Sequence, residues 1–274
     1  MKDIECTEFL KWCLPQLRLR WPGFRKVRRQ VCKRLNRRIS ELGLSDLFAY
    51  RGYLDGHPEE RKILDSLCRI TISRFYRDRG VFDTLRSRIL PALAKSASET
   101  GADEIRCWCA GCCSGEEAYT LQILWKICVI PVIQQRLLLR IIATDTDHDV
   151  LERAQKGIYP ESSLIDLPKE LIQLAFIRSG KSYSIRKTFR EDIEFARQDI
   201  RKQLPEGTFH LILCRNLVLT YFEEALQIEI LERVLEKLVP GGIFVAGIHE
   251  SIPEEVSTTI QYDKIKGIYQ KVMP

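Results

Sequence analysis

The chain has 274 residues, of which 45% are hydrophobic and 29% are charged, and its formal net charge is +6. This composition supports a substantial hydrophobic core and excludes intrinsic disorder. No run approaches the roughly eighteen apolar residues of a membrane span. The start, MKDIECTEFLKWC, lacks the long apolar core of a signal peptide, so the protein is expected to be cytoplasmic.

Residues 1–95 are predicted to be helical and strongly basic. Between residues 23 and 43 the apolar positions recur every three or four residues, which is typical of an amphipathic helix. The opposite face carries the cations Arg29, Lys33, Arg34, Arg37 and Arg38. One interpretation is a solvated charged face; the other is a docking surface for an acidic protein, a nucleic acid or an anionic surface.

Helical periodicity resumes at 58–70 and 80–95, and the small polar segment SASETGADE (96–104) then marks a boundary. Beyond it, expected strands alternate with expected helices, which indicates a parallel sheet covered on both faces. The expected strands are 105–109, 137–143, 209–214 and 243–248; the expected helices are 115–129, 149–156 and 223–238, the last closed by Pro240-Gly241-Gly242. Short strand-like pieces at 182–185 and 193–196 indicate a small inserted β subdomain.

Ten cysteines are present, and in a reducing cytosol they are not expected to form disulfides. The densest cluster comprises Cys107, Cys109, Cys112 and Cys113. Structural zinc sites pair distant C-x-x-C units or add histidines at helical spacing, whereas the four histidines here are isolated. The sequence therefore predicts no metal site, and free cysteines that act as small core residues.

The segment CAGCCSGEEAY (109–119) lies between an expected strand and an expected helix. Gly111 and Gly115 allow the backbone to approach a ligand closely, as in the cofactor-binding turn of a doubly wound sheet. The loop lacks the G-K-[ST] ending of a P-loop, and two adjacent carboxylates would repel a pyrophosphate. A cationic or hydroxyl-rich ligand fits this turn better.

Three further polar positions follow expected strands. Asp145 follows RIIAT, where a carboxylate commonly holds a ribose diol. Asp199 follows the strand-like piece FAR and could receive an exocyclic amine, and Arg215-Asn216 follow LILC. Because carboxyl ends of parallel strands share one edge of a sheet, these positions describe a pocket for a positively charged nucleoside, for which S-adenosylmethionine is the obvious candidate.

Five motifs in this order and spacing resemble those of the CheR family, the chemoreceptor glutamate O-methyltransferases, over nearly the whole chain. The motifs are SRFYRD (73–78), CAGCCSGEEAY (109–119), ATDTDHDVLERAQKGIY (143–159), LILCRNLVLTYF (211–222) and PGGIFVAGIHES (240–251). The resemblance implies an α/β fold: a doubly wound Rossmann-like methyltransferase sheet with a small β insertion, preceded by an all-helical domain. The expected boundaries are 1–78 for the helical domain, 71–95 for the linker and 96–274 for the methyltransferase domain, with the insertion at about 160–196.

The resemblance also implies roles for individual residues. Arg77 and Tyr221 would lie nearest the transferring methyl group. Contacts to S-adenosylmethionine, or to the product S-adenosylhomocysteine, are implied for Thr71, Ser73, Arg77, Ala110, Gly111, Glu117, Asp145, Asp199, Ile200, Arg215 and Asn216. Glu116 is interpreted as a cap at the positive end of its helix. The basic helix matches the family's receptor-docking surface.

The implied reaction forms a methyl ester on a glutamate of an acidic protein such as a chemoreceptor cytoplasmic domain. A glutamate side chain, with a pKa of about 4.3, is an anion at neutral pH and needs no general base. Two departures indicate a divergent branch: CRNLVLTYF has one more residue after Asn216 than the family's CRNVMIYF, and Thr71 stands where Asn is frequent. The alternatives are a carboxyl methyltransferase of a small molecule or non-receptor protein, a nucleic-acid methyltransferase, and a non-catalytic cofactor-binding sensor.

Overall fold

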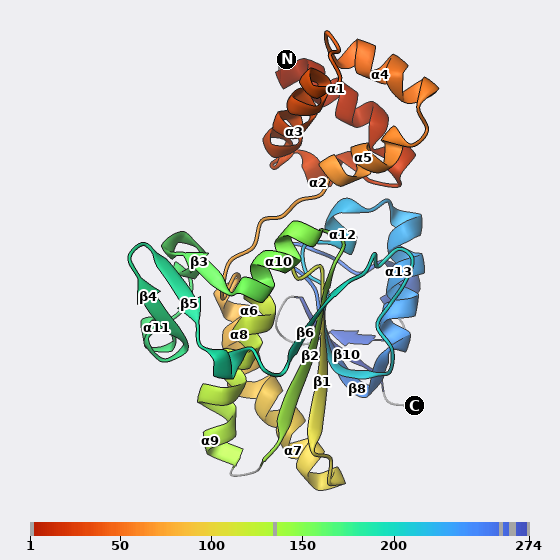
Figure 1. Ribbon diagram of the computed structural model, residues 1–274. Helices are drawn as coiled ribbons and strands as arrows, with labels where there is room; N and C mark the ends of the chain where they lie inside the picture. Colours follow the sequence, from red (N-terminus) through yellow and green to blue (C-terminus); the bar gives the residue numbers. More distant parts are fainter. Residues whose placement is uncertain (1–2, 134–135, 258–259, 263–266, 273–274) are drawn as a thin grey trace. The chain divides into compact units, whose positions relative to one another are not determined.

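The structure is a computed structural model that describes residues 3–133, 136–257, 260–262 and 267–272 (Figure 1). It divides into two compact units. The first comprises Met1–Thr71 with Thr220–Gln227, and the second comprises Ile72–Leu219 with Ile228–Pro274. Each unit is built around different secondary structure, and each is described by itself.

The first unit is helical, as the sequence predicts. Its elements are α1 (Asp3–Cys13), η1 (Pro15–Leu17), α2 (Trp21–Phe24), α3 (Arg28–Glu41), α4 (Leu47–Gly56) and α5 (Glu60–Leu67). The amphipathic helix predicted between residues 23 and 43 is confirmed only for α3, which buries Val31, Leu35 and Ile39 at a spacing of four; Phe24 belongs to the separate short helix α2. Residues 220–227 join this unit through a β-bridge between Leu19 and Phe222.

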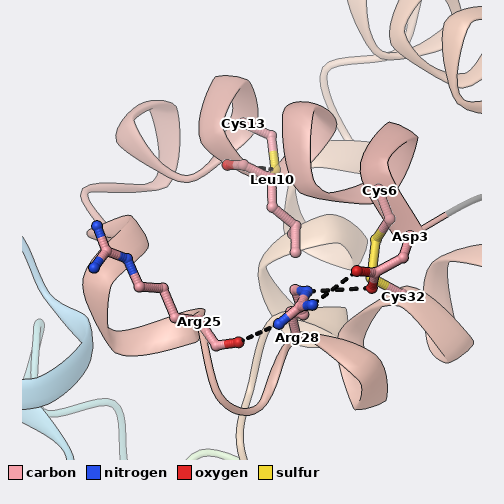
Figure 2. Close-up of a disulfide and its surroundings, with 7 residues drawn as sticks. All are labelled: Asp3, Cys6, Leu10, Cys13, Arg25, Arg28 and Cys32. Atoms are coloured by element: carbon pink, nitrogen blue, oxygen red, sulfur yellow. Dashed lines mark hydrogen bonds and ion pairs between the residues drawn. A yellow bond between two sulfur atoms is a disulfide. The ribbon is translucent and has the colours of Figure 1, made fainter.

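A disulfide links Cys6 of α1 to Cys32 of α3, with 6.0 Å between their Cα atoms (Figure 2). The expectation that the chain forms no disulfide is therefore wrong. The two cysteines lie 26 residues apart in the sequence but at facing positions of two packed helices, and helical periodicity alone does not reveal that pairing. Beside the disulfide, Arg28 donates two hydrogen bonds to the Asp3 carboxylate, at 3.2 and 2.7 Å. The other eight cysteines are free thiols, as predicted.

The second unit contains a seven-stranded sheet in the order β6-β2-β1-β7-β8-β10-β9. Its strands are β1 (Glu104–Ala110), β2 (Leu138–Asp145), β6 (Ile193–Arg197), β7 (Phe209–Leu213), β8 (Leu238–Val245), β9 (Ile260–Tyr262) and β10 (Ile268–Lys271). The first five strands in this order run parallel, and β10 and β9 pair antiparallel. The predicted doubly wound α/β sheet is confirmed.

Two expectations about individual strands need correction. Pro240-Gly241-Gly242 do not precede the last parallel strand but lie within β8, where they bulge out between the pairs Phe209–Leu238 and Leu211–Ile243. The piece 193–196, expected in the β insertion, is instead β6, which pairs in parallel with β2 at the edge of the large sheet. A short apolar strand has the same pattern in either sheet, so its partner is decided by tertiary packing.

The β insertion is a three-stranded antiparallel sheet in the order β3-β5-β4. Its strands are β3 (Ile158–Pro160), β4 (Phe176–Ser179) and β5 (Ser182–Ile185), with η4 (Glu161–Leu164), α11 (Lys169–Ala175) and η5 (Lys187–Phe189) beside them in the chain. The predicted strand at 182–185 is confirmed as β5.

Helices cover both faces of the large sheet, with α8 and α13 on opposite sides (Figure 1). The helices outside the insertion are α6 (Arg79–Thr84), η2 (Leu85–Ile89), α7 (Leu90–Thr100), α8 (Glu116–Leu124), η3 (Trp125–Val129), α9 (Ile130–Ile133), α10 (His148–Lys156), α12 (Val218–Tyr221), α13 (Glu224–Glu236) and α14 (Glu254–Ser257). Within the described ranges, no helix is long and apolar enough to cross a membrane.

The disulfide gives the first testable prediction. Replacing Cys32 by serine should lower the free energy of unfolding of the oxidised helical unit by about 3 kcal/mol, because the cross-link restricts the unfolded chain. The measurement is urea denaturation of the full chain with and without dithiothreitol. Cys13→Ser is the matched control, since Cys13 is buried but unbridged, and its effect should be the same in both conditions. Equal stability of oxidised wild type and Cys32→Ser would contradict the prediction.

Candidate active site

The loop between β1 and α8 wraps around the end of β2. The backbone N–H groups of Gly111 and Cys112 both donate to the carbonyl of Thr144, at 2.8 and 2.9 Å. Gly111 has φ +70°, and a Cβ there would lie 2.7 Å from the Leu217 side chain. Gly115 has φ +85°, and its Cβ would lie 3.0 Å from neighbouring side chains. Glycine is therefore required at both predicted positions of this turn.

Asp145 ends β2 beside this loop, and each of its carboxylate oxygens already accepts one backbone N–H. Oδ2 accepts from Cys113 at 2.9 Å, and Oδ1 accepts from Asp147 at 3.0 Å. Burial raises the pKa of Asp145, and hydrogen bonds from the backbone N–H groups of Asp147, Cys113 and Thr146 act against that shift. Because a carboxylate offers about four acceptor positions, Asp145 can still accept from a further donor such as a ribose hydroxyl.

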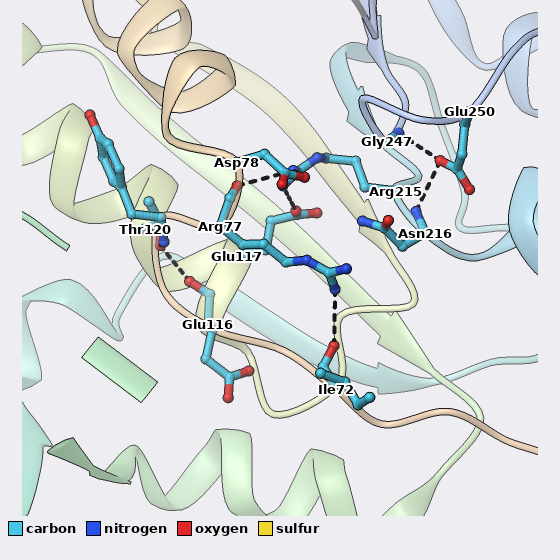
Figure 3. Close-up of polar contacts among 11 residues, drawn as sticks. Ile72, Arg77, Asp78, Glu116, Glu117, Thr120, Arg215, Asn216, Gly247 and Glu250 are labelled. Carbon is cyan, nitrogen blue, oxygen red and sulfur yellow. Dashed lines mark hydrogen bonds and ion pairs between the residues drawn. The ribbon is translucent and has the colours of Figure 1, made fainter. Parts of the chain in front are cut away.

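A buried arginine organises the residues next to this loop (Figure 3). The side chain of Arg215 is only 2% exposed and forms ion pairs with Glu117 and Asp78, both at 2.6 Å. It also donates to the backbone carbonyl of Arg77 at 3.0 Å, and its guanidinium lies over the Phe82 ring. Arg215 thus connects the end of β7, the start of α8 and the segment at 77–78. Sequence reasoning missed Asp78, whose only signal was its place in SRFYRD.

The segment at 76–78 has an unusual backbone. Tyr76 and Asp78 have φ values of +59° and +63°, a region that non-glycine residues seldom adopt. The Tyr76 N–H donates to the Thr120 hydroxyl at 3.3 Å. Nη1 of the half-buried Arg77 donates to the Ile72 carbonyl at 3.3 Å, as Figure 3 shows. Contacts from several elements therefore hold Arg77 in place, as is common where a strained backbone carries a functional side chain.

The two adjacent glutamates have different surroundings. The Glu117 side chain is 17% exposed and pairs with Arg215. Glu116 is buried, and within the described part of the chain its Oε2 has no hydrogen-bond partner. Burial raises the pKa of Glu116, opposed by its own backbone N–H and by the Ser73 hydroxyl. Ser73 therefore lies beside Glu116. The capping role of Glu116 stays a prediction.

Asp199 follows β6, and the loop it occupies runs beside Asp145, since the Gln198 N–H donates to the Asp145 carbonyl at 3.0 Å. Burial alone would raise the pKa of Asp199, but hydrogen bonds from Arg201 and its charge outweigh burial and lower that pKa. Arg201 Nε and Nη2 each lie 2.9 Å from a carboxylate oxygen. The next residue, Ile200, is buried. A contact between Asp199 and a base stays a prediction.

The remaining predicted residues of this unit are Ala110 and Asn216. Ala110 is the buried last residue of β1. Asn216 follows β7 with φ +52°, and its backbone N–H donates to Oε2 of Glu250 at 3.0 Å. Sequence reasoning assigned no role to Glu250, which lies in the motif at 240–251. Within the described ranges, no three His, Cys, Asp or Glu side chains are placed to hold a metal ion.

Two predicted site residues belong to the helical unit. The Thr71 hydroxyl lies 3.3 Å from Nη2 of Arg34. The Tyr221 ring packs edge-on against Phe24 with centroids 5.2 Å apart, and its carbonyl accepts from the Arg20 N–H at 2.9 Å. The roles of Thr71 and Tyr221 in the site stay predictions.

The five cations of the predicted docking surface do not have equal freedom. Arg38 donates to both oxygens of the buried Glu60, at 2.9 and 2.8 Å, and Arg34 donates to the carbonyls of Leu67 and Arg69. These two side chains are partly buried in contacts within their own unit. The exposed members of the set are Arg29, Lys33 and Arg37.

The cysteines of the loop give a second prediction. Burial, and after it the charge of Glu116, raises the pKa of the Cys113 thiol to about 12, so only roughly 10⁻⁴ of it is thiolate at pH 8. Burial also raises the pKa of Cys112. We expect iodoacetamide at pH 8 to label both cysteines at least 100-fold more slowly in the folded protein than in urea, with the rate rising as pH rises towards 12. Peptide mass spectrometry measures this, and equal rates in folded and unfolded protein would contradict it.

Comparison with known proteins identifies the family. Residues 71–267 match the model of the CheR methyltransferase, SAM binding domain. The chain is 33% identical over 187 residues to a chemotaxis protein methyltransferase of Listeria monocytogenes, covering 68% of each chain. It is 29% identical over 243 residues to a chemotaxis protein methyltransferase of Escherichia coli, covering 82% of this chain and 77% of that one. A protein of the same description from Borreliella burgdorferi is 28% identical over 224 residues, covering 80% and 78%.

The groups at the carboxyl edge of the sheet fit S-adenosylmethionine. Asp145 can accept a further hydrogen bond, as from a ribose hydroxyl, and the partly exposed carboxylate of Glu117 suits the ammonium of the methionine part. The chain therefore belongs to the CheR family and is an S-adenosylmethionine-dependent methyltransferase.

Proposed function

We propose that this methyltransferase acts on a protein glutamate, forming a side-chain methyl ester, and that its acceptor is the cytoplasmic domain of a chemoreceptor. The three relatives compared above are chemotaxis protein methyltransferases, which supports this acceptor class. The observation that carries the proposal is the state of Arg77. Its two neighbouring carboxylates, Glu117 and Asp78, are both paired with Arg215.

The guanidinium of Arg77 is therefore available to bind another anion. Among the described residues it forms no ion pair, and its side chain donates a hydrogen bond to the Ile72 carbonyl. A half-buried guanidinium without a carboxylate partner favours an acceptor carboxylate over a neutral amine or hydroxyl. Arg77 would orient that carboxylate, and Tyr221 would donate one further hydrogen bond.

The chemistry requires little of the protein beyond alignment. Bound S-adenosylmethionine supplies a methyl group that is activated by the positive sulfonium. The acceptor glutamate is already an anion at neutral pH, so no residue of the chain has to remove a proton. Holding the acceptor oxygen in line and excluding water are then the main contributions of the site. His210 needs no catalytic role, because its Nδ1 accepts the Arg106 N–H and burial lowers its pKa.

The exposed cations of α3 give this proposal its docking surface. Arg29, Lys33 and Arg37 follow one another at intervals of four and so form one row along the helix. We propose that this row binds an acidic helix of the acceptor, and that Arg34 and Arg38 support α3 from within its own unit.

The cofactor site is tested by titration calorimetry with S-adenosylhomocysteine. Asp145→Ala should weaken binding by about 10- to 100-fold, because hydrogen bonds to a charged group contribute about 1.5–3 kcal/mol. Glu104→Ala is the matched control, since Glu104 is a carboxylate at the opposite end of β1, where it pairs with Arg140. Wild-type affinity in Asp145→Ala, or no binding by wild type, would contradict the proposed site.

The acceptor is tested with methyl-labelled S-adenosylmethionine and a purified chemoreceptor cytoplasmic fragment. Label should enter the protein as a base-labile methyl ester, and Arg77→Ala should lower kcat about 100-fold, because the acceptor loses its orienting charge. Arg77→Lys should retain part of the activity, and the exposed neighbour Arg79 provides the control, Arg79→Ala. Tyr221→Phe should lower turnover about tenfold. Undiminished turnover in Arg77→Ala, or label that resists base, would overturn the assignment.

A further inference from the structure

One buried carboxylate connects the loops that follow two neighbouring parallel strands. Oε2 of Glu250 accepts the backbone N–H of Asn216, after β7, at 3.0 Å and the backbone N–H of Gly247, after β8, at 2.6 Å (Figure 3). Glu250 is 5% exposed. Both loops lie at the carboxyl edge of the sheet, where the other cofactor residues of this unit lie.

The conformation of Asn216 depends on this contact. With φ +52°, Asn216 is in the left-handed region, which asparagine tolerates but which other contacts have to maintain. The backbone N–H of Asn216 donates to Glu250. The backbone orientation held by this hydrogen bond determines the direction in which the Asn216 side chain leaves the backbone. The N–H would otherwise have to find another acceptor inside the protein.

Gly247 completes the arrangement. A Cβ at Gly247 would lie 2.8 Å from Oε2 of Glu250 and 3.1 Å from Oδ1 of Asn216. The Asn216 amide therefore lies close against the backbone of Gly247, in space that only glycine leaves open. The Glu250 carboxylate and the bare backbone of Gly247 together define one position for the Asn216 side chain.

We infer that Glu250 is a positioning residue of the cofactor site, which acts through Asn216 and does not touch the cofactor. This inference rests on the proposed role of Asn216 in lining the methionine side of the pocket. A purely structural clamp between β7 and β8 is the competing interpretation. The two differ in one respect: a positioning residue loses its effect when Asn216 has no side chain to position.

The chemistry of the contact also predicts which replacements are tolerated. Both N–H groups donate to the same oxygen, so an acceptor is required at this point and a charge is not. Glutamine offers that acceptor through Oε1, whereas alanine leaves two buried donors without a partner. Glu250→Gln should therefore preserve the position of Asn216, and Glu250→Ala should not.

The test is calorimetric titration of the full chain with S-adenosylhomocysteine, using a double-mutant cycle. Asn216→Ala and Glu250→Ala should each weaken binding about tenfold, and Glu250→Gln less than about threefold. The double variant should bind within about threefold of Asn216→Ala alone. Glu104→Ala again serves as the control and should match wild type.

The outcomes separate this inference from the proposed function. If Asn216→Ala binds like wild type while Asp145→Ala does not, the pocket stands but the role of Asn216 is wrong, and the inference about Glu250 is overturned with it. If Glu250→Ala weakens binding by the same factor with and without the Asn216 side chain, Glu250 is a structural clamp only. Should Glu250→Ala fail to fold, Gly247→Ala replaces it in the cycle, because the added Cβ displaces the same two groups.

Discussion

The ion pairs of Arg215 are the interaction on which the site depends. A guanidinium that is 2% exposed is stable only when its charge is matched, and Asp78 and Glu117 supply the two carboxylates at 2.6 Å. The three residues come from the loop after β7, the segment at 77–78 and the first turn of α8. Loss of the arginine would leave two carboxylates uncompensated in one place and would release the backbone of Arg77. The position of Arg77, the proposed catalytic arginine, therefore depends on the buried side chain of Arg215, which donates to the Arg77 carbonyl.

The same pairing divides the charges of the site into two groups. Asp78 and Glu117 both pair with Arg215, and Asp199 pairs with Arg201, so the ion pairs of these carboxylates are made with arginines other than Arg77. Within the part of the chain that the structure describes, Asp145 forms no ion pair and is held by backbone N–H groups. A carboxylate held in that way stays available to hydroxyl donors. The site thereby combines hydrogen-bond acceptors with the positive charge of Arg77, which in the proposed function orients the acceptor carboxylate.

The sequence allowed the strand–loop–helix turn at Gly111 and the carboxylate after β2 to be predicted, because both follow from local pattern. It did not reveal the partners of the charged residues. Asp78 and Glu250 are ordinary acidic residues in the sequence, and their importance arises from which backbone groups the fold brings to them. The Cys6–Cys32 disulfide and the sheet membership of β6 were missed for the same reason. Hydrophobic periodicity indicates which face of a helix or strand is buried, but not which residues that face contacts.

Counting the cations of α3 in the sequence overestimates the positive charge that this helix exposes. Five cations on α3 indicated a broad positive face, yet Arg34 and Arg38 lie partly buried among acceptors of their own unit. Glu60 pairs with Arg38 because a buried carboxylate is stable only with such donors. What remains exposed is a narrow row at Arg29, Lys33 and Arg37, with one charge about every 5.4 Å turn of the helix. A row of that spacing can face carboxylates repeated at the same interval on a second helix, which is the arrangement that the proposed acidic acceptor helix requires.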